Sequence, residues 1–256
     1  MVVDMSLQFA TVSAASSISK QLNSCGLNMF ALLDANKIHD NAVPSDATSV
    51  MLIGNYGRKL WDCIPDSLHQ GLHPVDDFSK AAVSRVLTAV IGSVGWTLLF
   101  PNRSLPCAPA LQSLGRAAGW HHPSPLGNGI NPEHGLWFAY RAVVAINSDI
   151  TGGADATAEP TDSMPGSDSP CIRCVDQPCI KSCPPQALST DGPPDLKACV
   201  NFRSADQSPC AERCLARQQC PVGRQSIYAD DQIRYFYRQS LQSLQRWVAE
   251  TSRSDS

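Results

Sequence analysis

The chain has 256 residues, of which 43% are hydrophobic and 17% are charged, and its formal net charge is −3. This length suits one large domain with a smaller one, and the apolar content is sufficient for a packed core. Like charges form no runs, so the composition indicates neither a nucleic-acid partner nor a membrane partner. The first residues lack the basic start and the long apolar stretch of a signal peptide, so we expect a cytoplasmic protein.

The first 150 residues alternate between strand and helix patterns. Apolar runs rich in β-branched or aromatic residues predict strands over residues 30–35, 49–54, 95–100 and 137–146. We expect helices near residues 10–24, 78–91 and 108–118, and Asp76 or Asp77 is expected to cap the second of them. Together these elements predict an α+β domain over residues 1–150.

The rest of the chain divides into three parts. Residues 151–170 are small, polar and acidic, which predicts a flexible connector between domains. Residues 171–224 contain eight of the eleven cysteines. Residues 225–256 are expected to form a C-terminal helix over about 229–248, followed by a short tail.

The eight cysteines form two groups, each of which ends in Cys-Pro. The first group has the pattern CxxCxxxxCxxxCP, and the second group is spaced more widely. The cysteines are Cys171, Cys174, Cys179 and Cys183 in the first group, and Cys199, Cys210, Cys214 and Cys220 in the second. This internal repeat is typical of a small ferredoxin-like domain with two [4Fe–4S] clusters, because each cluster takes four thiolates.

In ferredoxins of this kind the two halves exchange one ligand. That exchange predicts one cluster on Cys171, Cys174, Cys179 and Cys220, and a second on Cys183, Cys199, Cys210 and Cys214. A single cluster is an alternative, because the spacing of the second group is unusual. Zinc sites and disulfides are further alternatives, although only one CxxC pair occurs and no export signal accompanies it. Cys25, Cys63 and Cys107 are isolated in sequence and are interpreted as small buried hydrophobes.

The charge balance of the cysteine-rich residues favours a cluster domain that supplies electrons to the domain attached to it. Residues 170–224 contain seven Lys or Arg and five Asp or Glu. A free-standing ferredoxin that docks through its own negative surface would be more acidic.

The segment between residues 106 and 146 is the other candidate functional region. Its glycines and prolines predict a long constrained loop ahead of the last strand. Within an apolar strand, Arg141 requires an anionic or carbonyl partner, whereas Trp137 is expected in the core. His121 and His122 are interpreted as loop histidines.

This segment resembles cobalamin-processing proteins of the CblC type, whose pattern is matched by Asn131, Pro132, Gly135, Trp137, Phe138, Ala139 and Arg141. The HPVDDF sequence at residues 73–78 is similar to another segment of that family. The eight-cysteine part resembles epoxyqueuosine reductases and corrinoid-dependent reductive dehalogenases, which join a related domain to two [4Fe–4S] clusters. Glu133 replaces a basic residue of the CblC type, so glutathione-dependent dealkylation is not implied.

The resemblance implies a nitroreductase-like front domain that holds a corrinoid (cobalamin) or, as an alternative, a flavin. The cofactor-binding residues that we expect are Ser124, Gly127, Asn131, Gly135, Trp137 and Arg141. The resulting hypothesis is an oxidoreductase that takes electrons from a redox partner protein and passes them through the clusters to this cofactor or to a small-molecule ligand. The alternatives are a non-catalytic electron carrier and a zinc-stabilised interaction protein.

Overall fold

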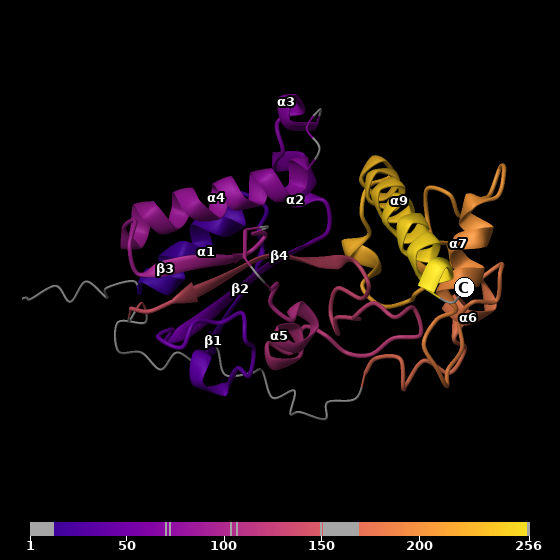
Figure 1. The fold of residues 1–256 in the computed structure, drawn as a ribbon, viewed down its shortest axis with the longest axis horizontal. Helices are drawn as coiled ribbons and strands as arrows, with labels where there is room; N and C mark the ends of the chain where they lie inside the picture. Colours follow the sequence, from indigo (N-terminus) through magenta and orange to yellow (C-terminus); the bar gives the residue numbers. More distant parts are fainter. Residues whose placement is uncertain are drawn as a thin grey trace, which may run out of the picture.

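The computed structural model describes residues 13–69, 71, 73–102, 104–105, 107–148, 150 and 169–254, except for the side chains of residues 69, 247–249 and 251–254. Figure 1 shows a sheet with helices on one side of the molecule and a set of short helices on the other, with a long C-terminal helix between them. We call the described residues of 13–150 the sheet region and residues 169–226 the cysteine region. The predicted connector falls almost wholly on residues 151–168, which lie outside the described residues, as does the end of the predicted tail.

The sheet has four antiparallel strands in the order β1-β2-β4-β3. The strands are β1 Met29–Asp34, β2 Ser49–Tyr56, β3 Trp96–Phe100 and β4 Phe138–Ile146. All four strand predictions are therefore confirmed. The two central strands, β2 and β4, are buried along most of their length, which explains why their sequences are nearly continuous apolar runs.

The helices of the sheet region lie on both faces of the sheet (Figure 1). They are α1 Ala14–Ser24, α2 Lys59–Cys63, α3 Asp66–His69, α4 Pro74–Ile91 and α5 Leu111–Ala117, and a 3₁₀ turn, η1, covers Ala35–Lys37. The larger apolar cluster joins one face of the sheet to α1 and α4, and includes Leu22, Met51 and Val83. A smaller cluster on the opposite face includes Leu114 of α5.

The predicted capping of α4 is wrong. The helix begins with Pro74 directly after His73, which makes no side-chain cap bond. Proline is favoured at this position because its missing N–H would have no partner in the first turn. Asp76 and Asp77 instead lie inside the first turn, where their negative charge is favourable next to the helix N-terminus.

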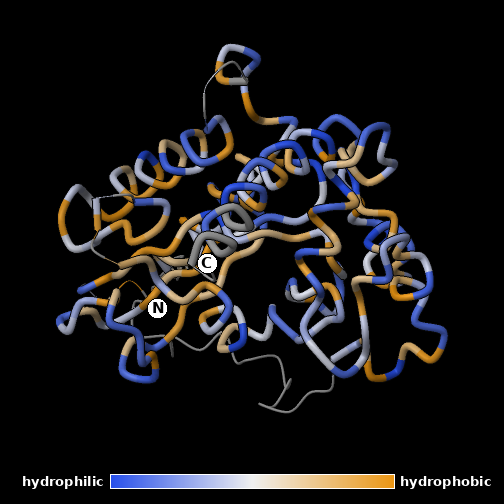
Figure 2. Tube along the Cα trace, turned by 45° about the vertical axis from the view of Figure 1, so that its right-hand side comes forward, coloured by the Kyte–Doolittle hydropathy of each residue, from blue (hydrophilic) through white to orange (hydrophobic). Residues whose placement is uncertain are grey.

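The cysteine region contains only short helical segments among its described residues. These are α6 Pro178–Lys181, α7 Leu196–Ser204, α8 Leu215–Gln218 and the 3₁₀ turn η2 Arg224–Ser226. The C-terminal helix α9, Asp230–Ser254, starts where it was predicted, is longer than predicted, and lies against α7. Figure 2 shows the strands in the hydrophobic colours and most of α9 in the hydrophilic ones.

The structure confirms a mixed α+β chain built on one antiparallel sheet. The finer predictions of a nitroreductase-like domain and a ferredoxin-like domain remain predictions. Within the described ranges, no helix combines the length and apolar character that a membrane span requires.

Candidate functional site

Four cysteines from the two ends of the cysteine region lie close enough for their charges to interact. Cys179 interacts electrostatically with Cys171, Cys174 and Cys220, and Cys220 interacts with Cys171 and Cys174. The first three come from the loop before α6 and from α6 itself, whereas Cys220 follows α8, which packs against α6. We call these four residues the first cysteine set.

The other four cysteines form a second set. Cys199 of α7 interacts electrostatically with Cys183, Cys210 and Cys214. Cys210 likewise interacts with Cys183 and Cys214. Cys183 is only four positions after Cys179, but it belongs to the other set. The two sets have the same members as the two groups that the sequence predicts when the two halves of the cysteine pattern exchange one ligand.

Burial is the largest influence on the pKa of at least two thiols in each set. It raises the pKa of Cys179, Cys199, Cys210 and Cys220, and the neighbouring cysteines raise these pKa values further. Backbone N–H groups act in the opposite direction: hydrogen bonds from Ile180, Leu215 and Val222 lower the pKa of Cys179, Cys210 and Cys220, respectively. The fold therefore supplies donors that stabilise charge on these sulfur atoms.

The sulfur atoms of neither set converge closely enough to coordinate a single metal ion. Within the part of the chain that the structure describes, no three His, Cys, Asp or Glu side chains form a group that could hold a metal ion. What the structure brings together are two loose groups of four cysteines, each drawn from separate segments.

A large cavity lies between the first cysteine set and the sheet region. Its volume is about 1170 Å³, and all four cysteines of the first set line it. The opposite wall is formed by the end of α5 and by the following loop, including Arg116, His121, His122 and Ser124. No cysteine of the second set is among the lining residues.

His121 is held rigidly in this wall. Its Nδ1 lies 3.1 Å from the Tyr140 hydroxyl, and a Cβ atom at Gly129 would overlap its ring. Burial lowers the pKa of His121, and the nearby Arg116 lowers it further. His121 is therefore a neutral imidazole at neutral pH.

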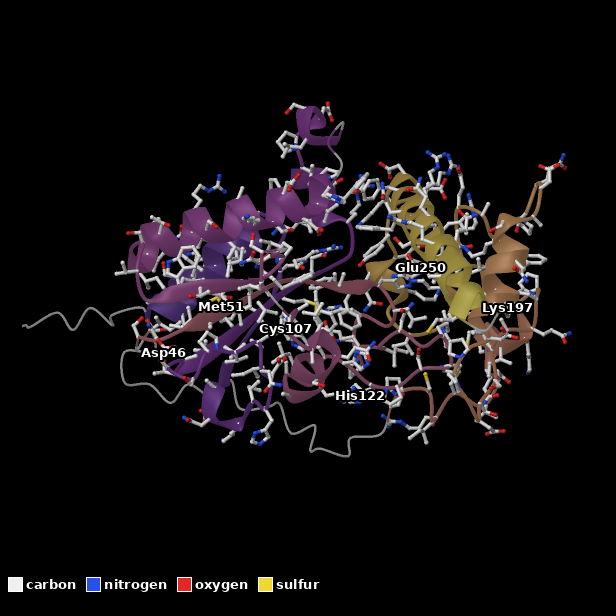
Figure 3. The ribbon with its side chains drawn as sticks, viewed as in Figure 1. Asp46, Met51, Cys107, His122, Lys197 and Glu250 are labelled. Carbon is white, nitrogen blue, oxygen red and sulfur yellow. The ribbon has the colours of Figure 1, made fainter. Side chains whose placement is uncertain are left out.

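His122 is the second buried histidine of the wall, with 9% of its surface exposed. Its Nε2 has no hydrogen-bond partner within the described ranges. A buried polar atom without a partner is costly, so this nitrogen would gain from a hydrogen bond if a bound group came within its reach. Figure 3 shows His122 below the sheet, between α5 and the cysteine region.

Two of the six predicted cofactor residues lie in the loop that borders the cavity. Ser124 lines the cavity, and its hydroxyl donates a hydrogen bond to the backbone oxygen of Asn128. Gly127 is not among the lining residues; it adopts a positive φ of 72°, and its backbone lies against Pro194. Gly127 thus shapes the loop, while Ser124 faces the candidate binding space.

Asn131 and Gly135 form the junction with the cysteine region. The Asn131 side-chain oxygen accepts hydrogen bonds from the backbone N–H groups of Glu133 and His134, which closes a tight turn. Gly135 ends this turn, and a Cβ atom there would overlap the carbonyl group of Val222. The junction is a direct backbone contact between the loop and the segment after Cys220.

Trp137 is a core residue, as predicted from its position. It is 1% exposed and packs edge-on against Tyr228. The guanidinium of Arg217, from α8, lies 4.3 Å from the centroid of its ring and donates a hydrogen bond to the Leu136 backbone oxygen. Trp137 therefore anchors the cysteine region to the sheet region and does not line the cavity.

Arg141 has the carbonyl partner that its burial requires. Its Nε donates a hydrogen bond of 2.6 Å to the side-chain oxygen of Asn55, and its guanidinium lies 5.1 Å from the centroid of the Phe236 ring. Burial lowers the pKa of Arg141, while interactions with Tyr228 and Asp76 raise it. Arg141 joins β4 to α9 and is not among the cavity-lining residues.

The two histidines lie in a loop, as predicted. The burial of both in the cavity wall opposite the first cysteine set was not predicted. The signal was a Trp-His-His sequence between a predicted helix and a loop rich in glycine and proline. Side chains in such a loop are fixed by the close backbone packing that glycine allows, as Gly129 shows for His121.

No protein-family profile matches the chain, and no curated protein matches it significantly.

Proposed function

We propose that this protein is an iron–sulfur redox protein, in which two [4Fe–4S] clusters pass electrons to a cofactor in the cavity beside the first cysteine set. The observation that carries the proposal is the division of eight cysteines into two sets of four, one of which lines a large cavity. When bound, a cluster supplies one-electron chemistry at low potential.

The donor set is suitable for such clusters. Each set offers four sulfur ligands, and each includes at least one sulfur that accepts a backbone hydrogen bond. Hydrogen bonds to cluster sulfurs and burial are the means by which proteins adjust the reduction potential. A cluster of four iron and four sulfide atoms also separates its thiolates more widely than one tetrahedral ion does, which suits two loose groups.

Two arginines, the buried Arg203 and the half-buried Arg217, lie near the cysteine sets and offset negative charge. Arg203 interacts with Cys199 and donates a hydrogen bond to the backbone oxygen of Cys210, and Arg217 interacts with Cys220. Thiolate-ligated clusters are anionic, and a buried negative charge is costly without a positive partner. These arginines make the cysteine region suitable for two anionic groups.

The arrangement places the first cysteine set between the second set and the cavity along the proposed electron path. The first set lines the cavity, whereas the second set lies beyond it, beside α7. Electrons that enter at the second set would reach the cavity through the first. A cofactor there would be reduced from one side while His121, His122 and Ser124 bind it from the other.

The cavity suits a large cofactor, for which we propose a corrinoid, with a flavin as the alternative. Pockets for drug-sized ligands have volumes of about 300 to 1,000 Å³, and this cavity is larger. Its wall also contains the buried, unpartnered Nε2 of His122. This part of the proposal rests on the sequence resemblance as well as on the cavity.

Metal and sulfide analysis of protein purified without oxygen tests the clusters. We expect roughly eight iron and eight sulfide per chain. About four of each would indicate a single cluster, and near-stoichiometric zinc without iron or sulfide would overturn the proposal.

Titration of the reconstituted protein with cobalamin tests the cavity. Binding is expected to shift the visible spectrum to the base-off form and to permit reduction of the cobalt by the clusters. Thr190→Trp should weaken binding by filling the cavity, whereas Thr88→Trp, on the exposed face of α4, should not. If flavin binds in place of cobalamin with the same sensitivity to Thr190→Trp, the alternative cofactor holds. Binding of neither would leave the electron carrier as the function.

One observation favours that second candidate, a non-catalytic electron carrier. Ile172 and Val175 are 70% and 92% exposed, and they flank Cys171 and Cys174 of the first set. Exposed apolar residues beside a cluster would let a redox partner approach closely. Val175→Asp should then slow electron transfer to an added acceptor protein without changing the iron content.

A further inference from the structure

Two cysteines outside the eight meet where the end of α1 packs on α2. Cys25 directly follows α1, and Cys63 is the last residue of α2. The two thiols interact electrostatically, and both are partly exposed. The sequence predicts small buried hydrophobes at both positions, but both are partly exposed and their segments lie in contact.

The backbone contacts around this pair are close. The Cys63 Sγ lies 3.9 Å from the backbone oxygen of Ser24, the neighbour of Cys25. A Cβ atom at Gly26 would overlap the backbone of Leu60, so the turn after α1 lies directly on α2. The segments that carry the two cysteines are therefore held in contact by the main chain.

The two sulfur atoms have different surroundings. The Cys25 Sγ lies 3.3 Å from Nη2 of Arg85, which projects from α4. From this position the guanidinium can donate a hydrogen bond to the Cys25 sulfur while that sulfur attacks an oxidant. For Cys63, burial raises the pKa, and Cys25 raises it further. Cys63 therefore stays a thiol at neutral pH and is the weaker nucleophile of the two.

We propose that Cys25 and Cys63 form a redox-active thiol pair, in which Cys25 reacts first with hydrogen peroxide and Cys63 then closes a disulfide. This pair uses none of the eight cysteines of the two sets, so it is independent of the proposed cluster function.

The chemistry balances with peroxide as the oxidant. The Cys25 thiolate attacks one peroxide oxygen, the O–O bond breaks, and a sulfenic acid forms while hydroxide leaves and takes a proton. The Cys63 sulfur then attacks the Cys25 sulfur, the S–O bond breaks, and a second water leaves. In total two thiols lose two electrons and two protons, and one peroxide becomes two waters. A dithiol reductant reverses the disulfide by exchange.

Peptide mass spectrometry tests the pair in the full chain. Trypsin releases residues 21–37 and 60–80 as separate peptides, which contain Cys25 and Cys63 as their only cysteines. After mild peroxide treatment we expect a linked product of these peptides that is two hydrogen atoms lighter than their sum. Dithiothreitol should separate it. Because the readout is the peptide itself, damage to the other cysteines does not affect it.

Single variants test the order of reaction. In Cys63→Ser, the Cys25 sulfenic acid should persist and react with dimedone, whereas in Cys25→Ser the Cys63 peptide should stay unlabelled. Arg85→Gln should slow formation of the linked product several-fold. Arg246→Gln, at an exposed position of α9, is the matched control and should not slow it.

Three results would overturn the proposal. One is that both peptides remain unlinked at peroxide levels that oxidise the exposed Cys107. The second is that Cys25 and Cys63 link to other cysteines as often as to each other. The third concerns the rate of dimedone labelling in the two single variants. If Cys63 in Cys25→Ser is labelled as fast as Cys25 in Cys63→Ser, Cys25 does not react first.

Discussion

The sheet region and the cysteine region are held together by different means. The sheet region buries two apolar clusters of its own, on opposite faces of the sheet. Among the described residues, no apolar cluster is made from the cysteine region alone: Cys220 and Val222 share a cluster with Ile130 and Leu136 of the sheet region. Hydrophobic burial thus accounts for the stability of the sheet region, whereas the cysteine region needs anchors and, on our proposal, bound clusters.

The largest expected effect follows from removal of the clusters. When iron is removed with a chelator, residues 171–224 should lose several kcal/mol of local stability, because the bonds that hold the four sulfur atoms of each set to one cluster are then lost. Hydrogen-exchange mass spectrometry of protein with and without iron measures this by region. Peptides from β2 and β4 should keep their protection. Equal loss of protection in both regions would show that the regions are not stabilised differently.

The backbone junction should give the next largest effect. Gly223 has a φ of 71°, and a Cβ atom there would overlap the backbone of His134. Gly223→Ala should therefore cost about 3 kcal/mol or more in urea unfolding, from backbone strain and overlap together. Gly57 also has a positive φ, but the nearest atom to its Cβ position is 3.9 Å away, so Gly57→Ala should cost only about 1 to 2 kcal/mol. Similar losses in both variants would mean that the junction is not tightly packed.

Arg217 is expected to contribute slightly less. Arg217→Leu removes the hydrogen bond to the Leu136 oxygen and the contact with the Trp137 ring, at a cost of about 3 kcal/mol. Arg213→Leu is the control, because Arg213 forms a partly exposed ion pair with Asp230, worth about 1 kcal/mol or less. Chemical denaturation of both variants, followed by tryptophan fluorescence, measures the difference. If the Arg217→Leu protein is as stable as the Arg213→Leu protein, Arg217 does not anchor the cysteine region to the sheet region.

The smallest effect concerns pH. Burial lowers the pKa of His121, in the cavity wall, and of His134, at the junction, below the ordinary value of 6.5. Below pH 6.5 the unfolded chain takes up protons that these folded histidines resist, so the free energy of unfolding should fall with the pH until their folded pKa is reached. Urea unfolding at about pH 7.5 and pH 5.5 measures this. His121→Gln should reduce the pH dependence, and an unchanged slope would exclude His121 as a contributor.

The strands and the larger helices could be predicted because local patterns determine them. Apolar runs indicated β2 and β4, and the need of Arg141 for an acceptor followed from the cost of a buried guanidinium, although Asn55 itself could not be named from the sequence. The eight cysteines could be grouped because each half ends in Cys-Pro. The start of α4 could not be assigned correctly, because Pro74 competes with the aspartates that follow it.

The functions of Asn131 to Trp137 could not be predicted from sequence. This segment was expected to bind a cofactor, but Gly135 contacts Val222 and Trp137 contacts Arg217, which are far away in the chain. Contacts of this kind depend on how the two regions dock. A family-like motif does not distinguish a residue that binds a ligand from one that positions the neighbouring region. The proximity of Cys25 and Cys63 likewise depends on how the end of α1 packs on α2.

The most direct test of the account is the iron content of two double variants prepared without oxygen. A single missing ligand can leave a partial cluster, so each variant removes two. Cys174→Ala with Cys179→Ala removes two cysteines of the first set and should leave roughly four iron per chain. Cys179→Ala with Cys183→Ala removes one ligand from each set, and both clusters should be damaged, with less iron or only partial clusters retained. If the second variant keeps one intact [4Fe–4S] cluster while the first loses both, the proposed division of the cysteines is contradicted.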